Sequence, residues 1–277
     1  MKNNLKFNTL ILDILYRKWV MFMIKELTKT ISLQYTGQSI NLPSDLKEKI
    51  QEFWDLAVKE NPALYNGEYY AVEKIEETEN KITMSILKTS YSHYLYDERI
   101  GIDDEQYKCN IPWSGILLLT LDNYWVFGQS SKNTSFPDGF QISGGGIDSE
   151  DITGSNINLV QNLKRELKEE MNLDLDEIEY NFKYIEYPNK KRNAYGIIAI
   201  GKLNMTKDEL YNHFEKYKEY LEQCNLDIEF INLIFLKKGH AIKEFDTYTN
   251  PKRDYLRELI SKEEYEETKI VKDMENV

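Results

Sequence analysis

The chain has 277 residues, of which 41% are hydrophobic and 30% are charged, and its formal net charge is -12. This composition predicts a packed globular protein of one large or two smaller domains and excludes a disordered chain. The acidic balance argues against nucleic-acid binding, which needs a basic face, and an acidic chain that binds a small anion usually recruits a divalent cation. Cys109 and Cys224 form neither a metal-ligand nor a disulfide pattern, so we expect a cytoplasmic protein.

Residues 1–24 form an N-terminal extension that we set apart from the domains, with Met21 and Met23 as alternative translation starts. Charged side chains such as Arg17 and Lys18 interrupt its short apolar runs. No run reaches the roughly 18 apolar residues of a membrane-spanning helix, and no small-residue cleavage site of a signal peptide follows. We therefore expect neither a membrane segment nor a membrane partner.

The segment from residue 25 to residue 104 has the pattern of a small α+β accessory domain. Apolar residues recur three and four positions apart after Pro43, which predicts a helix with Ser44 as its N-cap. Asn61-Pro62 ends that helix, because the residue before proline avoids the helical conformation. The expected elements are a strand over 31–35, a helix over 44–60, and strands over 69–75 and 81–88.

The segment from residue 105 to residue 277 contains a longer series of strand and helix patterns. Asp122-Asn123 is the turn of an apolar hairpin, and Thr206 with Glu209 forms a capping box that opens a helix. Three glycines, 144–146, lie in a predicted loop before a helix. The expected elements are a hairpin over 115–121 and 124–127, a helix over 157–171, strands over 180–186 and 194–203, a helix over 206–223, a strand over 228–236 and a helix over 251–265.

The segment Arg165-Glu166-Leu167-Lys168-Glu169-Glu170 carries the most informative chemistry. On a helix, Glu166, Glu169 and Glu170 fall within an arc of about 100°. Their carboxylates repel one another, and a hard cation such as Mg²⁺ removes the conflict because it prefers oxygen ligands. Arg165 is placed to pair with one carboxylate and fix its orientation. Taken alone, however, this pattern is typical of a solvated acidic helix face as well.

The glycines and the acidic helix together resemble the signature of the Nudix hydrolase superfamily, G-x5-E-x7-R-E-U-x-E-E-x-G-U, in which U is a bulky apolar residue. Gly145 matches the first glycine, the segment 165–170 matches the core, and Leu173 matches the last apolar position. Asn172 replaces the final glycine, and asparagine tolerates the left-handed conformation of a helix C-cap.

The segment before the acidic helix departs from that signature. It is longer than in the pattern, so Ile157 stands where the early glutamate is expected, while Glu150 and Asp151 lie in the lengthened loop. No residue of this chain is therefore a clear equivalent of the early glutamate.

The resemblance implies an α/β/α sandwich with a mixed sheet from about residue 105, preceded by the small α+β domain. It also implies that Mg²⁺, or Mn²⁺ in its place, is held by Glu166, Glu169, Glu170 and the Gly145 carbonyl, while Arg165 orients the carboxylates. A water molecule activated by the metal then attacks one phosphorus of a pyrophosphate. The group that takes the proton from this water is not identified by the sequence.

The first region is similar to the N-terminal region of the UDP-glucose/UDP-galactose pyrophosphatase branch of that superfamily, through Trp54 and the segments 61–67 and 89–91. This implies a nucleotide substrate, a UDP-sugar, that is cleaved to UMP and a sugar 1-phosphate. A nucleoside triphosphate or ADP-ribose is an alternative, because the signature contacts the diphosphate and not the base. A non-catalytic nucleotide sensor of the same fold is a second alternative, and the acidic balance disfavours mRNA decapping.

Further residues are candidates for substrate binding, and each has a structural alternative. The Asn-Gly pair at 66–67 is equally typical of a turn, the tyrosines at 91 and 94 could stack on a uracil or pack between domains, and the basic cluster 190–192 is typical of an exposed turn. The residues before and within the glycine segment could line a pocket. The candidates are Asn66, Gly67, Tyr91, Gln141, Gly144 and Lys191.

Overall fold

The computed structural model describes residues 24–62, 64–134, 136–189 and 192–275, with side chains described as far as residue 265. The proposed extension over residues 1–24 lies outside the described residues except for Ile24, which begins a strand. Within the described ranges, none of the helices combines the length and the apolar composition that crossing a membrane requires.

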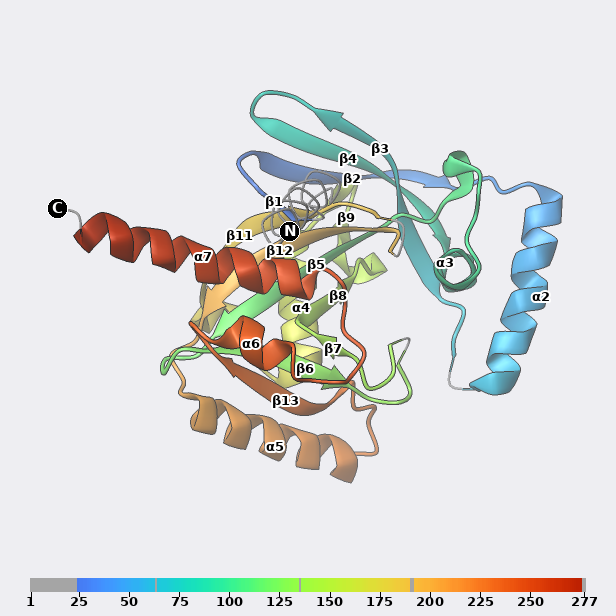
Figure 1. Cartoon of the computed structure of the whole chain (residues 1–277). Coiled ribbons are helices and arrows are strands. Elements are labelled where there is room, and N and C mark those ends of the chain that lie inside the picture. The colour runs from blue at the N-terminus through green and yellow to red at the C-terminus, as the bar shows by residue number, and fades with distance from the viewer. Residues whose placement is uncertain (1–23, 63, 135, 190–191, 276–277) are drawn as a thin grey trace, which may run out of the picture.

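The larger of the two sheets that the structure describes is mixed. Its strands are β1 (Ile24–Glu26), β5 (Ile111–Leu119), β6 (Tyr124–Ser130), β11 (Glu179–Glu186), β12 (Ala194–Lys202) and β13 (Phe230–Lys237). They follow the order β1-β11-β12-β5-β6-β13, and the short strands β7 (Phe140–Gln141) and β8 (Ser143–Gly146) pair with β6 and β5 (Figure 1). Only β5 and β12 pair in parallel in this sheet, as far as it is described.

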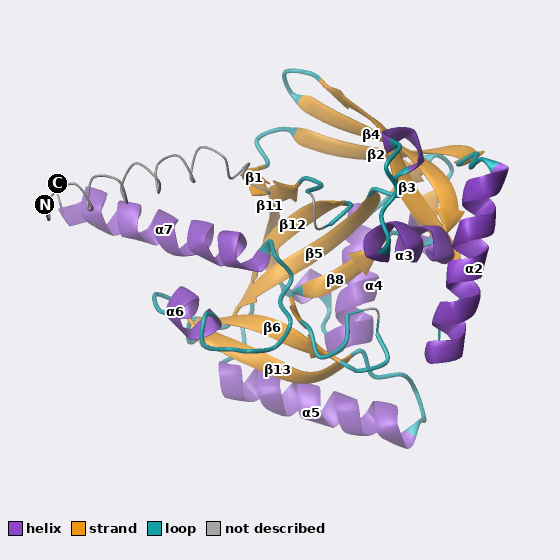
Figure 2. Cartoon of the chain, turned by 45° about the vertical axis from the view of Figure 1, so that its right-hand side comes forward, coloured by secondary structure: helices purple, strands orange, loops and turns teal. Residues whose placement is uncertain are grey.

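Helices cover both faces of the larger sheet (Figure 2). These are α4 (Leu159–Met171) and α5 (Lys207–Gln223) on one face, and α6 (Ala241–Phe245) and α7 (Leu256–Glu275) on the other. Along β5, Ile116 and Leu118 pack toward α4 and α5, whereas Leu117 and Leu119 pack toward α6 and α7, as the two-residue period of a strand requires. The predicted α/β/α sandwich with a mixed sheet is confirmed.

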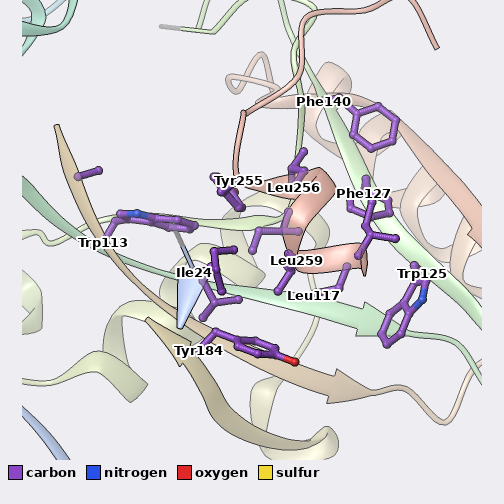
Figure 3. Packing of buried hydrophobic residues seen from close by; sticks show 14 of the residues in the cluster. Ile24, Trp113, Leu117, Trp125, Phe127, Phe140, Tyr184, Tyr255, Leu256 and Leu259 are labelled. Atoms are coloured by element: carbon purple, nitrogen blue, oxygen red, sulfur yellow. The ribbon is translucent and has the colours of Figure 1, made fainter. Parts of the chain in front are cut away.

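The core beneath α7 combines residues from distant parts of the chain. Figure 3 shows Leu256 and Leu259 of α7 beside Leu117 of β5, with Trp113, Trp125 and Phe127 around them. Each of these side chains is at most 3% exposed. Burial of such aromatic and aliphatic groups contributes about 1.5–3 kcal/mol per side chain, which fixes α7 and the segment before it against the sheet.

A smaller, five-stranded sheet forms most of the first region. It comprises β2 (Thr30–Ser39), β3 (Glu68–Glu77), β4 (Lys81–Ser90), β9 (Ile152–Thr153) and β10 (Asn156–Ile157), in the order β3-β4-β2-β10-β9. Strands β2 and β4 are parallel, and the connection between them contains α2 (Ser44–Glu60) and β3. The helix and the three longer strands confirm the expected elements of this region.

The two sheets exchange short strands at their boundary. Strand β1 pairs with β11 of the larger sheet, and β10 pairs with β2 of the smaller one, with Ile157 opposite Leu33. A shared core joins Met84 of β4 to Ile185 and Ile197 of the larger sheet. The two regions therefore share one core. Their division into an accessory domain over 25–104 and a second domain over 105–277 stays a proposal.

One predicted N-cap and one predicted helix start are wrong, and both errors arise at the cap. Pro43 rather than Ser44 is the N-cap of α2, and no side chain caps this helix, because Ser44 already has helical geometry. Helix α4 begins at Leu159 and not at 157, because the Asn158 side chain accepts hydrogen bonds from the backbone N–H groups of the first turn. The capping box of Thr206 and Glu209 on α5 is confirmed.

The last helix also starts later than predicted. It begins at Leu256 instead of 251, because Phe140 donates its backbone N–H to the Pro251 carbonyl at 2.8 Å and so keeps this segment extended beside β7. Helix α3 (Tyr91–Arg99) is absent from the sequence prediction, since its buried residues include Ser92, His93 and Asp97 and form no apolar stripe.

His93 ties α3 to the segment 101–110 that leads into β5. Its ring is fully buried, with Nδ1 at 2.8 Å from the Thr89 hydroxyl and Nε2 at 2.8 Å from the Tyr107 carbonyl oxygen. A carbonyl only accepts, so Nε2 carries the proton and Nδ1 accepts from Thr89, and the neutral ring is fully satisfied. Burial lowers the pKa of His93, although the Tyr107 carbonyl and Asp97 oppose this effect.

The lowered pKa of His93 makes stability depend on pH. The native state resists protonation, so the stabilisation is present at pH values above 6.5, the ordinary value for histidine, and is lost as the pH falls below it. We expect the melting temperature of the wild type to fall more steeply between about pH 7.5 and 5.5 than that of His93→Gln. Circular dichroism melts measure both slopes, with the exposed His240→Gln as control; parallel slopes for wild type and His93→Gln would contradict this role.

Candidate active site

Helix α4 presents three carboxylates from one side. Leu163 and Leu167 are fully buried against β5, and this packing fixes the rotation of the helix about its axis. Glu166 and Glu170, which are 7% and 3% exposed, then face strand β8. The Glu169 side chain lies further out, at 47% exposure. The predicted grouping of the three carboxylates on one side of a helix is therefore present in the structure.

The three glycines form strand β8, so the prediction of a loop is wrong. They pair with β5, where Gly145 lies opposite Ser114. A Cβ on Gly145 would lie 2.4 Å from Oε1 of Glu166, and a Cβ on Gly144 would lie 2.2 Å from the Ser114 carbonyl oxygen. Because these positions lack side chains, the strand backbone can lie directly against both β5 and the carboxylate.

Arg165 orients two of the three carboxylates. Its Nη2 atom lies 2.9 Å from Oε1 of Glu166 and 3.2 Å from Oδ2 of Asp151, and its Nη1 atom lies 3.1 Å from Oε2 of Glu169. The Nη2 atom also donates to the Gly146 carbonyl oxygen at 3.2 Å. A planar guanidinium with several donors can hold such acceptors in fixed directions.

Neutral donors hold the third carboxylate. One oxygen of Glu170, Oε2, accepts hydrogen bonds from the Ser143 hydroxyl at 2.6 Å and from the Gly144 backbone N–H at 2.9 Å. Burial nevertheless raises the pKa of Glu170 well above its usual value, and the neighbouring Glu166 and Glu229 raise it further. The two donors offset only part of the cost of a buried negative charge.

The same conflict affects Glu166. Burial raises the pKa of Glu166 to about 8; Arg165 opposes this effect, while Glu229 and Glu169 add to it. Two neighbouring carboxylates with raised pKa values form a site where positive charge is stabilising, because like charges in a desolvated site resist ionisation.

A buried polar network supports Arg165 from behind. Asn162 donates to the Gly146 carbonyl oxygen at 2.8 Å and to Oδ2 of Asp151 at 2.9 Å, and accepts from the Ser114 hydroxyl. Asp151 also accepts from the backbone N–H of Asp148 at 2.8 Å. Its other oxygen, Oδ1, has no hydrogen-bond partner among the described residues. The lengthened loop thus places a buried carboxylate beside Arg165.

A cleft of about 540 Å³ runs past these groups. This volume is in the range of pockets that bind nucleotide-sized molecules. The residues that line it come from both sheets, from α3, α4 and the segment before α7, and from the loop that precedes β13. The side chains that line it include Tyr69, Tyr91, Tyr94, Trp113, Phe136, Gln141, Arg165, Glu166, Glu169, Glu170, Arg192, Asp227, Glu229, Arg253 and Tyr255.

The structure brings most of the candidate residues to this cleft. Tyr91, Gln141, Gly144 and Gly145 line it, together with Arg165 and the three glutamates of the segment 165–170. They come from elements far apart in the sequence.

The remaining candidates lie elsewhere. Asn66 and Gly67 do not line the cleft, and they stabilise the start of α3 instead: Ser92 donates its backbone N–H to Asn66 Oδ1 at 2.9 Å, and Tyr91 donates to the Gly67 carbonyl at 3.1 Å. Their proposed contact with a base or sugar is therefore withdrawn in favour of the structural alternative. Lys191 lies outside the described residues.

Three charged residues of the cleft were not among the individual candidates. Glu229 is an exposed residue of the loop before β13, and partial desolvation of its carboxylate raises its pKa, with a further contribution from Glu169. Arg192 and Arg253 lie on the hairpin after β11 and in the segment before α7. Arg192 belongs to the basic cluster 190–192, whereas Glu229 and Arg253 belong to no motif, because only the fold brings these segments to α4.

The chemistry of the carboxylates fits a divalent cation. Their oxygens are the hard ligands that Mg²⁺ and Mn²⁺ prefer, and the raised pKa values of Glu166 and Glu170 indicate that the site lacks positive charge. Among the described residues, no three acidic, histidine or cysteine side chains are already gathered as a metal site. Arg165 engages oxygens of Glu166 and Glu169, so a cation would compete with this guanidinium for them.

No protein-family model matches the chain, and no curated protein matches its sequence. Among solved structures, the fold is similar to a MutT protein from Methanosarcina mazei, with 13% identity over 57% of this chain and 94% of that chain and a TM-score of 0.38. It is also similar to an Ap4A hydrolase from C. elegans, with 15% identity over 54% and 93% and a TM-score of 0.34. The Nudix domain of NrtR from Shewanella oneidensis, in complex with ADP-ribose, has 16% identity over 65% and 99% and a TM-score of 0.35. At these values the similarity assigns neither family nor function.

The two glycines beside the site should respond differently to an added methyl group. In Gly145→Ala the atoms nearest to the methyl group all belong to the side-chain end of Glu166, whereas in Gly144→Ala the methyl group meets the Ser114 backbone at a residue with φ of +143°. We expect Gly145→Ala to keep its stability within about 1 kcal/mol and to weaken Mn²⁺ binding at least about tenfold. We expect Gly144→Ala to lose about 2 kcal/mol or more.

Urea denaturation measures the stabilities, and electron paramagnetic resonance of free Mn²⁺ measures the binding. Unchanged Mn²⁺ affinity in a folded Gly145→Ala protein would show that the position of the Glu166 carboxylate is irrelevant to the cation.

Proposed function

We propose that this cleft hydrolyses a phosphoanhydride bond in a nucleoside diphosphate derivative with the help of Mg²⁺ or Mn²⁺. The observation that carries the proposal is the pair of buried carboxylates, Glu166 and Glu170, which lie against the glycine-rich strand β8 in the wall of a nucleotide-sized cleft. Such a pair is costly unless positive charge is supplied, and a substrate diphosphate brings a divalent cation with it.

A bound cation would neutralise the carboxylates and polarise the phosphate oxygens of the substrate. Glu166, Glu169 and Glu170 are the side chains proposed to hold it, with the carbonyl oxygen of Gly145. Arg165 orients Glu166 and Glu169. Ser143 and the Gly144 backbone hold Glu170 through Oε2. The carboxylate is therefore fixed, and so is the direction of its second oxygen, Oε1.

The proton of the attacking water needs an acceptor. Glu229 is the residue proposed for this role, because it lines the cleft from a different segment than the three α4 carboxylates. Within the described residues, no ion pair holds its carboxylate. Its place on a loop lets it approach the reacting water without disturbing α4.

A UDP-sugar is the substrate proposed first, with UMP and a sugar 1-phosphate as products. The resemblance of the first region to the UDP-sugar branch supports this choice, and so does the entry of Tyr91 and Tyr94 from that region into the cleft. Both cysteines are free thiols, which supports a cytoplasmic location. ADP-ribose and nucleoside triphosphates are the alternatives, because the carboxylates would contact the diphosphate and not the base.

A substrate panel at neutral pH, with and without Mg²⁺, tests the proposal. It contains UDP-glucose, UDP-galactose, ADP-ribose, ADP-glucose and the common nucleoside triphosphates, and chromatography follows the products. We expect Mg²⁺-dependent release of UMP from the UDP-sugars. Turnover of another compound would keep the reaction and replace the substrate, whereas no turnover by folded protein would favour a nucleotide sensor.

Substitutions on α4 test the residues. Glu169→Gln and Glu170→Gln should each lower kcat at least about a hundredfold, the scale of losing a principal electrostatic group. The exposed Glu177→Gln, which removes a carboxylate outside the cleft, is the matched control and should keep wild-type turnover. Near-normal turnover in folded Glu169→Gln or Glu170→Gln would remove that residue from the site.

A further inference from the structure

Two arginines line the cleft without contacting the α4 carboxylates. Arg192 and Arg253 are the arginine pair, and their ion-pair partners are Glu186 and Glu98 rather than residues of α4. They come from segments that are separated in the sequence but lie on the same cleft. The proposed hydrolysis assigns no role to either arginine.

Two aromatic rings and a carboxylate hold the guanidinium group of Arg192. Its guanidinium carbon lies 4.7 Å from the ring centre of Trp113 and 5.1 Å from that of Tyr255. Its Nη1 atom lies 3.2 Å from Oε2 of Glu186, which is fully buried and also accepts from the Trp113 indole N–H at 2.9 Å. The carboxylate engages only Nη1 of the guanidinium.

Arg253 repeats this arrangement with different residues. Its guanidinium carbon lies 4.0 Å from the ring centre of Phe136, and its Nη1 atom lies 3.3 Å from Oε1 of Glu98. Its side chain is 15% exposed. In both arginines, therefore, an aromatic ring fixes the plane, a carboxylate fixes one nitrogen, and the residue still reaches the cleft. A guanidinium held in this way loses little freedom when it binds an anion.

The two guanidinium groups influence the pKa values of the same two neighbouring residues. Burial raises the pKa of Tyr94 well above its usual value, and both Arg192 and Arg253 oppose this rise. Burial likewise raises the pKa of Glu186, and both arginines oppose that rise too. Tyr94 stays protonated and can donate, so the arginines and this hydroxyl form a group of donors. Glu68 also lines the cleft, but Lys88 pairs with it.

We propose that the arginine pair binds a phosphate group of the substrate away from the α4 carboxylates, which in a UDP-sugar is one of the two phosphates of the diphosphate. The proposal rests on the proposed function, because it extends the substrate along the same cleft. Phosphate is the chemistry chosen because it is rich in acceptors, matches the planar fork of arginine and suits two fixed positive charges. The competing explanation is that both ion pairs only join segments of the fold.

Binding of inorganic phosphate in the presence of EDTA tests the arginine pair without metal or turnover. Calorimetric titration at constant ionic strength, set with chloride, should give saturable binding with Kd of roughly 1 mM. Arg253→Gln should weaken this binding at least about tenfold, because it removes charge-assisted hydrogen bonds. Arg253→Lys should weaken it less, since it keeps the charge and loses the fork.

Arg257→Gln is the matched control, because Arg257 lies on α7 and pairs with Asp246 outside the cleft. It should bind phosphate as the wild type does. Thermal melts establish that each variant is folded. Equal phosphate affinity in folded Arg253→Gln and wild type, or no saturable binding by the wild type, would overturn the proposal and leave the ion pairs as links within the fold.

A kinetic experiment then distinguishes a substrate phosphate from free phosphate. With a substrate that the panel identifies, inorganic phosphate should inhibit competitively, and Arg253→Gln should remove this inhibition. Non-competitive inhibition would overturn the assignment to the substrate. Because the binding titration uses no turnover, its failure is distinguishable from a failure of the proposed hydrolysis.

Discussion

The burial of two carboxylates on successive turns of α4 is the constraint on which the site depends. Glu166 and Glu170 lose most of their hydration, and an uncompensated buried charge costs several kcal/mol. Arg165 compensates the first, while a hydroxyl and a backbone N–H compensate the second only in part. The protein thus keeps a deficit of positive charge in its cleft, which a divalent cation with a diphosphate would remove.

The rest of the fold keeps this arrangement in place. Strand β5 fixes α4 through its residues on one face and α7 through those on the other, so that the helix cannot rotate its carboxylates toward water. Strand β8 approaches α4 closely because its glycines have no side chains. The buried network of Asn162 and Asp151 positions Arg165 from behind.

Local patterns predicted the elements well and predicted the cleft only in part. The spacing of Glu166, Glu169 and Glu170 indicated a shared side because helical geometry is local, and Asn172 adopts the left-handed C-cap conformation, with φ of 53°, that its side chain tolerates. The glycines formed a strand because pairing with β5 overrode their turn preference. Arg192 belongs to the basic cluster 190–192 that the sequence singled out, whereas Arg253 and Glu229 were beyond prediction, since only long-range packing brings them to the cleft.

The central claim is that the α4 carboxylates bind a divalent cation together with a diphosphate. A crystal grown with Mn²⁺ and a non-hydrolysable methylene analogue of a UDP-sugar, or of the substrate that the panel identifies, tests it directly. The account predicts an anomalous Mn²⁺ peak within coordination distance of oxygens of Glu166 and Glu170, with the diphosphate on its other side. An ordered analogue in the cleft, with no Mn²⁺ at these carboxylates and with Arg165 still bound to them, would contradict it.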